Sequence, residues 1–316
     1  MPAGAGSRTR RVGMGQAMDE ILAIPRDTHV VAELAPESSL AAIWRRFGTD
    51  KAAVIGLAIL LVVTLAAVFA PWVAPDDPDF GFAGIRHAAP GVDGHLLGTD
   101  EAGRDILSRL IWGGRLSLFI SVTPTVIAAL VALVLGLASG FYGGAVDQVI
   151  MRVLDVFFAF PIVLLAILIA GALGPGPRNQ IVAIGFILIP YMTRVVRTAV
   201  VTTREQEFVE AARATGAGNF ELIRHEILPN VISPLVVYAT VLVGFMILVA
   251  AGLSFFGLGA NPPTADWGAM VNTGKGMISV APHVVLIPSL AILLVALAFN
   301  FVGDGLRDAL DPRGTT

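Results

Sequence analysis

The sequence predicts an all-α integral membrane protein with six transmembrane helices, and three observations lead to this fold class. Hydrophobic residues make up 55% of the 316 residues and charged residues only 14%, against about 25% charged in ordinary soluble domains. The mean hydropathy is +0.78. Six separate apolar stretches have the length of a helix that crosses the hydrocarbon core of a bilayer, about 20 residues.

Composition also limits the possible partners and chemistry. The net charge is only −3, and no basic cluster lies outside the membrane flanks, so we expect no nucleic-acid partner. The chain has no cysteine. Disulfides, thiolate metal sites and cysteine nucleophiles are therefore excluded.

The N-terminal third of the chain contains one apolar stretch between two polar segments. Residues 1–39 mix Gly, Arg, Asp and Pro without a sustained period, which predicts a mostly disordered cytoplasmic tail, and no apolar signal-peptide segment follows its early arginines. Residues 40–51 place Trp44 and Phe47 beside basic residues and predict a short interfacial helix or a basic collar before the membrane. Residues 52–74 are the first span, and residues 75–115 are too long and polar for a tight hairpin. We therefore group residues 40–115 as interfacial helix, first span and extracytoplasmic loop.

Residues 116–316 form the predicted core of five further spans. These are residues 116–140, 156–173, 181–201, 231–258 and 284–302. Arg194 and Arg197 lie at one end of the fourth span, where long side chains can snorkel toward water. The segment 142–161 is amphipathic and charged, so we expect it at the membrane surface before Pro161 interrupts the next helix. Gly140 and Gly144 have G-x-x-x-G spacing at a helix end, which we interpret as a turn.

A polar island, residues 202–234, separates the fourth and fifth spans. Thr202 with Glu205, and Thr203 with Gln206, have the spacing of a capping box, which predicts that a helix begins there. Gly216 is placed to end this helix after Ala214, since glycine adopts the left-handed conformation without a Cβ clash.

A second short helix is expected in the same island. Asn219 can cap its start, and Pro229 should stop it because proline cannot donate the next hydrogen bond. The island is thus predicted to be a helix-turn-helix outside the hydrocarbon.

The amino-acid sequence of the island resembles the EAA loop of ATP-binding-cassette importer permeases. Glu-Ala-Ala begins at Glu210, a Gly follows the second Ala by four positions, and Leu-Pro ends the pattern, with Glu226 where an apolar residue is common. The resemblance implies the type I importer permease fold and a coupling loop over residues 202–229 that seats on an ATPase subunit. The implied coupling residues are Glu210, Ala211, Ala212, Arg213, Gly216, Leu228 and Pro229.

Two more strings resemble the dipeptide, oligopeptide and nickel branch of these permeases, one at residues 97–118 and one at residues 251–270. The second departs from the family string at Phe256 and Ala265. Arg104, Asp105 and Arg109 fit a solvated helix face with local ion pairs. They also fit a stretch that packs on the core or touches a binding protein, and the two interpretations are compatible. Trp267 fits an interfacial belt. The implied signature residues are Gly98, Thr99, Asp100, Gly103, Arg104, Asp105, Pro262, Pro263, Trp267 and Gly268.

The distribution of Lys and Arg predicts the topology. With six spans and a cytoplasmic N-terminus, most of the 21 Lys and Arg residues fall on the cytoplasmic side. The positive-inside rule thus favours cytoplasmic termini and a cytoplasmic coupling loop.

Missing motifs restrict the function further. The chain has no G-x-x-x-x-G-K-[ST], so ATP and Mg²⁺ should bind to partner subunits, and we expect no enzyme activity or cofactor in this chain. His225-Glu226 begins like H-E-x-x-H, but Pro229 takes the fifth position. The interiors of the spans lack Asp, Glu, Lys and His, which ion-coupled carriers usually need.

The resemblance implies a multi-pass permease subunit of the bacterial inner membrane. Its implied partners are a related B-type permease, two cytoplasmic ATPase domains and an extracytoplasmic substrate-binding protein, and its implied substrates are dipeptides or oligopeptides. A nickel-chelate or glutathione importer is the alternative within the family. A non-transporting membrane scaffold or sensor is the alternative from another class, and a secondary carrier comes third.

Overall fold

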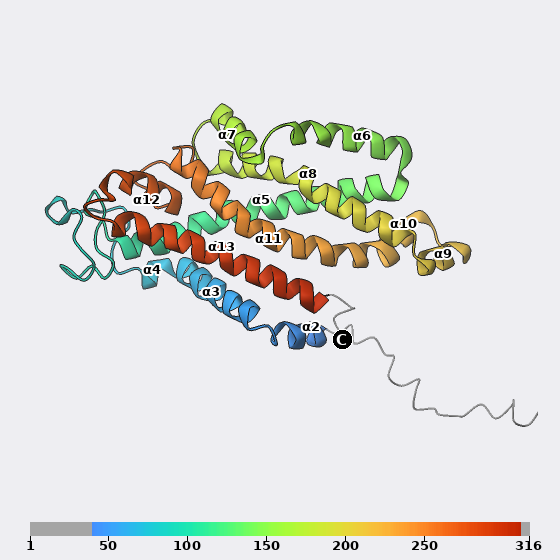
Figure 1. The fold of residues 1–316 in the computed structure, drawn as a ribbon, viewed down its shortest axis with the longest axis horizontal. Coiled ribbons are helices and arrows are strands. Elements are labelled where there is room, and N and C mark those ends of the chain that lie inside the picture. The colour runs from blue at the N-terminus through green and yellow to red at the C-terminus, as the bar shows by residue number, and fades with distance from the viewer. Residues whose placement is uncertain (1–39, 311–316) are drawn as a thin grey trace, which may run out of the picture. The chain divides into compact units, whose positions relative to one another are not determined.

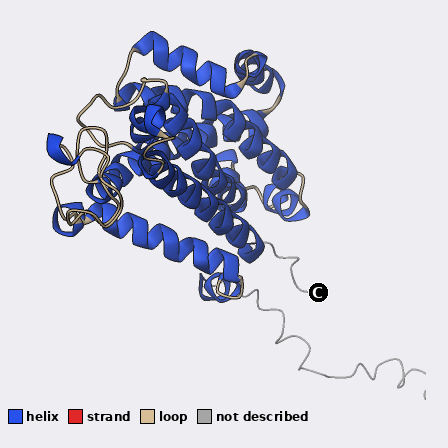
Figure 2. Cartoon of the chain, turned by 60° about the vertical axis from the view of Figure 1, so that its left-hand side comes forward, coloured by secondary structure: helices blue, strands red, loops and turns tan. Residues whose placement is uncertain are grey.

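The computed structural model describes residues 40–310, so the expected tail of residues 1–39 lies outside the described residues. Within residues 40–310 the chain forms helices and loops, with two isolated β-bridges and no strand (Figure 2). The chain divides into two units, Met1–Ala42 and Ile43–Thr316. Of the first unit, only residues 40–42 are described, and they are helical.

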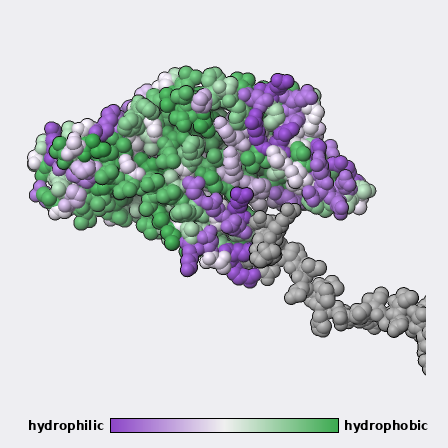
Figure 3. Space-filling model, viewed as in Figure 1, coloured by the Kyte–Doolittle hydropathy of each residue, from purple (hydrophilic) through white to green (hydrophobic). Residues whose placement is uncertain are grey.

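Among residues 40–310, five helices are long and apolar enough to cross a membrane. They are α3 (Lys51–Val68), α5 (Ile106–Tyr142), α8 (Pro177–Arg204), α11 (Leu228–Phe255) and α13 (His283–Leu310). They correspond to the first, second, fourth, fifth and sixth expected spans. In Figure 3 hydrophobic residues cover much of their middle, and hydrophilic residues gather toward the end that carries α9 and α10.

The third expected span is not one helix. Residues 156–173 contain a short 3₁₀ turn, η2 (Val156–Ala159), and the 12-residue helix α7 (Ile162–Leu173). The helix α6 (Gly144–Asp155) precedes them, and the chain bends by 91° between the two parts. Pro161 stands at the break as the N-cap of α7, because it has no N–H to continue a helix. Counting this bent pair as one span gives six.

Short elements complete the described part of the chain. Asp50 caps α3 by accepting hydrogen bonds from the backbone N–H groups of Ala52 and Ala53, and α2 (Leu40–Phe47) precedes it. The other short elements are α4 (Ala70–Val73), η1 (Ala83–Ile85), α9 (Glu207–Ala214), α10 (Asn219–Glu221), the π-helix η3 (Leu222–Ile227), α12 (Trp267–Gly274) and η4 (Lys275–Met277). Figure 1 shows α9 and α10 at one end of the long helices, and α12 with the loop of residues 74–105 at the opposite end.

The helices α5 and α8 pack closely against each other. A Cβ atom added at Gly136 would lie 2.5 Å from Val196 Cγ1, and one added at Gly140 would lie 2.8 Å from Val200 Cβ. The pair that lets these helices approach is therefore Gly136-x-x-x-Gly140. Our interpretation of Gly140 as part of a turn is wrong, because it lies inside α5 and the chain turns at the next glycines, after Tyr142.

Candidate functional site

The first half of the polar island starts later than predicted. Thr202 and Thr203 lie in the last turn of α8, which continues to Arg204, so neither threonine caps a new helix. The predicted capping boxes are wrong because both residues have the backbone of an ongoing helix. The N-cap of α9 is Gln206, whose side chain makes no capping bond and instead donates to the carbonyl of Thr202 at 3.3 Å.

The end of α9 agrees with the prediction. Gly216 has φ +94°, and its N–H donates to the carbonyl of Arg213 at 3.0 Å. The N–H of Ala217 donates to the carbonyl of Ala212 at 3.1 Å. These two bonds form a Schellman motif, which satisfies the last carbonyls of the helix and depends on a left-handed residue at Gly216.

The second half of the island differs from the prediction. Gly218 is the N-cap of α10, and Asn219 is its first helical residue. Pro229 does not stop a helix. It lies in the first turn of α11, within a helical run that continues from the preceding residues. A π-helical stretch, η3, connects α10 to α11, so one helical run joins the island to the bundle.

The island presents one face to the bundle and the other to solvent. Val209, Leu222 and Ile227 are buried and pack in a cluster with residues of α5, α8 and α11. The predicted coupling residues are mostly on the outer face: Glu210, Ala211, Arg213, Gly216 and Pro229 are exposed, and Ala212 and Leu228 are half-buried.

Two phenylalanines enlarge this outer face. Phe208 is 44% exposed and Phe220 is 74% exposed, and neither was singled out in the sequence. A pair of aromatic residues in a polar island was the signal that could have identified them, because exposed aromatic side chains are common at protein interfaces. We name the surface formed by Phe208, Glu210, Ala211, Arg213 and Phe220 the α9 surface.

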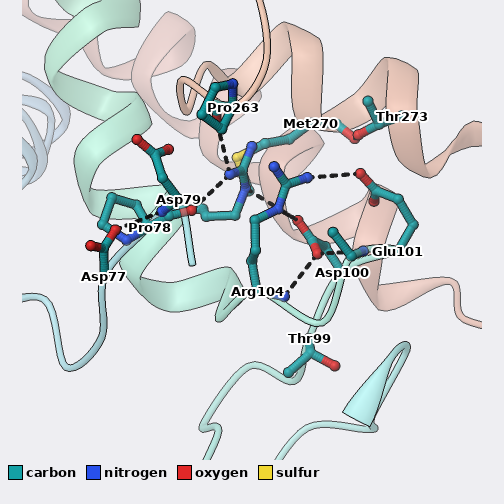
Figure 4. Close-up of polar contacts among 12 residues, drawn as sticks. Asp77, Pro78, Asp79, Thr99, Asp100, Glu101, Arg104, Pro263, Met270 and Thr273 are labelled. Atoms are coloured by element: carbon teal, nitrogen blue, oxygen red, sulfur yellow. Dashed lines mark hydrogen bonds and ion pairs between the residues drawn. The ribbon is translucent and has the colours of Figure 1, made fainter. Parts of the chain in front are cut away.

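At the opposite end, the signature at residues 97–118 forms a buried ionic cluster (Figure 4). Nε of Arg104 lies 2.7 Å from Oδ2 of Asp100, and Nε of Arg109 lies 3.3 Å from the same oxygen. Nη1 of Arg109 donates to the carbonyls of Pro78 at 2.8 Å and Pro263 at 3.1 Å. Both arginines are less than 10% exposed. Of the two interpretations of these charges, the packed one is therefore correct and the solvated face is wrong.

The neighbouring signature residues shape the loop itself. Asp105 is the N-cap of α5 and accepts from the N–H of Ser108 at 2.7 Å. Thr99 Oγ1 donates to the carbonyl of Ile85 and accepts from the N–H of Ala88. Gly103 has φ +77°, and a Cβ there would lie 2.0 Å from the carbonyl oxygen of Phe82. Only glycine fits that position. Gly98 is under a similar constraint, with φ +80°.

The two signatures meet at Trp267. Its indole nitrogen donates to the carbonyl of Leu110 at 2.8 Å, and its ring lies against Gly113 and Gly114, where an added Cβ would come within 3.1 Å and 2.9 Å of it. Trp267 is 2% exposed. The belt interpretation is therefore wrong, because the ring fills a space between α5 and α12. Gly268 is equally confined, since a Cβ there would lie 2.4 Å from the carbonyl oxygen of Ala251.

A buried acid next to Trp267 links four helices. Asp266 accepts from Ser254 Oγ at 2.6 Å, from the N–H of Gly268 at 3.0 Å and from Ser117 Oγ at 3.4 Å, and Ser254 accepts from Gln180 at 3.0 Å. Burial raises the pKa of Asp266, although these hydrogen bonds act in the opposite direction. Asp266 was missed in the sequence. A lone acid between a Pro-Pro pair and a tryptophan was the available signal.

Charged pairs fix α6 to α8. Asp147 lies 2.5 Å from Nε of Arg197 and 2.6 Å from its Nη2. Asp155 lies 2.5 Å from Nη2 of Arg194, whose guanidinium stacks 3.7 Å from the ring centre of Phe158. Acids on the neighbouring segment pair with both arginines, whose side chains are 48% and 35% exposed, so the expectation that they snorkel stays a prediction.

Comparison with known proteins agrees with this architecture. Residues 132–315 match the family model described as the binding-protein-dependent transport system inner membrane component. Residues 38–90 match the N-terminal transmembrane domain of oligopeptide transport permease C. Among solved structures, one titled as a crystal structure of an amino acid ABC transporter with histidines has a TM-score of 0.51 at 17% identity. It covers 62% of this chain and 91% of that chain, and it shows the fold alone.

Curated relatives align over most of the chain. The di/tripeptide transport system permease protein of Pseudomonas aeruginosa is 44% identical over 87% of this chain and 93% of its own length. The glutathione transport system permease protein of Pectobacterium atrosepticum is 42% identical over 85% and 90%. The dipeptide transport system permease protein of Alkalihalophilus pseudofirmus is 41% identical over 88% and 93%.

The described helices, the family match and the relatives agree on one assignment. Permeases of this kind are translocation subunits without enzyme activity, and they work in a transporter complex with other permease and ATPase subunits. This chain belongs to the family of binding-protein-dependent ABC importer permeases, and it is a multi-pass protein of the bacterial inner membrane.

Proposed function

We propose that this chain is the C-type permease subunit of an importer of short peptides, in which it forms the translocation pathway with a related B-type permease. The observation that carries the proposal is the α9 surface, a small exposed face held outside the bundle. Two cytoplasmic ATPase domains would drive the pair, and one of them would dock on the α9 surface.

The connections of α9 support a coupling role. Two residues, Glu205 and Gln206, separate α9 from α8, and a single helical run joins α10 to α11. Val209 and Leu222 seat the island on the ends of these helices. A displacement of the α9 surface by an ATPase would therefore reach α8 and α11 together, because the packed contacts between them are stiff.

The opposite end supports contact with a substrate-binding protein. The ionic cluster of Asp100, Arg104 and Arg109 holds the loop of residues 74–105 against the loop before α12. The side chains of Phe80, Phe82 and Leu96 in the loop of residues 74–105 are exposed and offer apolar contacts to a partner. With α9 in the cytoplasm, this end faces the outside, where a binding protein would deliver the substrate.

The names of the relatives favour two substrates. Permeases named for di/tripeptides or dipeptides are 44% and 41% identical to this chain, and permeases named for glutathione are 42% and 43% identical. Glutathione is itself a tripeptide, so both groups of names point to short peptides. A dipeptide or tripeptide importer is the first proposal, and a glutathione importer is the second.

Uptake into proteoliposomes tests the proposal. The assembled transporter and its binding protein should import a labelled dipeptide or glutathione only when ATP is enclosed with the ATPase subunits. Glu210→Lys should abolish most uptake because it reverses a charge on the α9 surface. Asp308→Lys makes the same charge change on an exposed residue of α13 and should leave uptake intact. Uptake without ATP, or equal uptake by both variants, would contradict the proposal.

A further inference from the structure

Three potential metal ligands converge in the loop of residues 74–105 and at the start of α5. Nδ1 of His95 lies 3.0 Å from Oδ1 of Asp105 and 3.6 Å from Oδ2 of Asp76. One ligand atom from each residue lies within 4.8 Å of the other two. The three residues come from separate segments. Asp76 follows α4, His95 ends a tight turn that begins at Val92, and Asp105 caps α5.

The backbone around these residues is fixed by hydrogen bonds. The N–H of His95 donates to Val92 at 3.0 Å, and its carbonyl accepts from Gly91 at 2.9 Å and from Gly98 at 3.2 Å. Asp105 is held as the N-cap of α5. The N–H of Asp76 donates to Ser108 Oγ at 2.9 Å. The ligand atoms are therefore positioned by the fold, which lowers the entropic cost of binding an ion.

We propose that Asp76, His95 and Asp105 bind one divalent transition-metal ion of the zinc class. Zinc bonds to nitrogen and oxygen of about 2.0–2.2 Å place neighbouring ligand atoms of a tetrahedral site about 3.3–3.5 Å apart. The separations of Nδ1 of His95 from the two carboxylates, 3.0 Å and 3.6 Å, lie on either side of this value. One imidazole and two carboxylates form a donor set that suits zinc and its neighbours, with a fourth position left for water.

A hydrogen-bonded pair without an ion accounts for only part of the geometry. It explains the contact between His95 and Asp105. It does not explain the position of Asp76, whose Oδ2 lies 3.6 Å from Nδ1 of His95. The carboxylate of Asp76 accepts no hydrogen bond from any residue between 40 and 310. The side chain of Asp105 is 1% exposed and that of Asp76 is 52% exposed. Asp105 is thus a buried ligand, and the exposed side chain of Asp76 lets an ion reach the site from water.

The site would cross-link a loop that has no covalent cross-link. The chain contains no cysteine, and the loop between α4 and α5 spans about thirty residues. An ion at this position ties the end of the first span to the N-terminus of α5 through the turn at His95. It also balances two carboxylates that otherwise share one imidazole.

Zinc content of the purified transporter tests the proposal. The complex should carry an affinity tag without histidine, be stripped with EDTA, be loaded with Zn²⁺ and be desalted before elemental analysis. The wild type should hold one zinc more per copy of this chain than His95→Gln, and Asp76→Asn should weaken the affinity about tenfold or more. Loading should also raise the unfolding temperature of the wild type and not that of His95→Gln.

Matched controls separate this site from general binding. Asp77→Asn changes the adjacent carboxylate, and His225→Gln removes a histidine on the polar island. Both should bind zinc like the wild type. Because Asp76 is exposed, its variant should fold even if His95→Gln does not. Equal zinc affinity in the wild type and Asp76→Asn, or no zinc retained by the wild type, would overturn the proposal.

Discussion

The indole nitrogen of Trp267 donates a hydrogen bond to the backbone carbonyl of Leu110, 157 positions earlier in the chain, at 2.8 Å. This bond joins the two family signatures into one structural unit. The ring of Trp267 occupies the space that Gly113 and Gly114 leave open on α5. The signatures therefore describe two halves of one contact between α5 and α12.

Trp267→Ala should destabilise the protein strongly. Replacing a buried aromatic residue with alanine usually costs about 3–5 kcal/mol of unfolding free energy, because the cavity cannot close completely. Trp72→Ala is the control, since Trp72 is 78% exposed against 2% for Trp267. Thermal unfolding of the purified protein in detergent should show a large loss for the first variant and little change for the second. Similar losses in both would show that Trp267 does not hold α5 and α12 together.

Glycine to alanine changes should have opposite signs at two helical positions. Alanine raises helix propensity by about 1 kcal/mol over glycine. At Gly252 of α11 an added Cβ meets nothing within 4 Å, whereas at Gly136 it would lie 2.5 Å from Val196 Cγ1. Gly252→Ala should thus be neutral or stabilising, and Gly136→Ala should destabilise by about 1–3 kcal/mol through overpacking. Unfolding measured for both variants under one condition decides the point. A stabilised Gly136→Ala would exclude the close α5–α8 crossing.

Asp266→Asn should change how stability depends on pH. Burial raises the pKa of Asp266 above its ordinary value of 3.8, so the folded state holds its proton more tightly than the unfolded state does. This contribution to stability is present at low pH and is lost as the pH rises from the unfolded pKa through the raised one.

Asparagine imitates the neutral acid and keeps one acceptor oxygen for Ser254 or Gly268. The stability of Asp266→Asn relative to the wild type should therefore increase from pH 4 to pH 8, as measured by thermal unfolding at several pH values. If the variant loses stability relative to the wild type over that range, the hydrogen bonds outweigh burial and the direction of the shift is wrong.

Local patterns in the sequence predicted local structure well. The apolar runs located five of the expected spans, and Gly216 marked the end of α9 because a left-handed residue there depends only on its neighbours. The predicted start of α9 was wrong, because it depends on where the preceding helix ends. Thr202 and Thr203 have a capping sequence, but α8 continues past them to Arg204, whose side chain donates to the carbonyls of Gly140 and Phe141 at the end of α5.

Long-range contacts could not be predicted from the sequence. The sequence around a tryptophan near the end of a span is the same whether the ring lies among lipid headgroups or against another helix. Trp267 lies against another helix. The ionic pairs of Arg194 and Arg197 likewise depend on how α6 folds back onto α8. Pro229 continues a helix because the π-helix before it changes the register, which proline statistics alone do not reveal.

The central claim is that the α9 surface docks an ATPase in the cytoplasm, and single-cysteine chemistry tests it most directly. The chain has no cysteine, so Ala211→Cys and Val92→Cys each introduce one exposed thiol at opposite ends of the bundle. In intact cells, a membrane-impermeant maleimide should label Val92→Cys and not Ala211→Cys. A thiol cross-linker added to membranes should join Ala211→Cys, and not Val92→Cys, to the ATPase subunit. Labelling of Ala211→Cys from outside, or ATPase cross-linking only through Val92→Cys, would contradict the account.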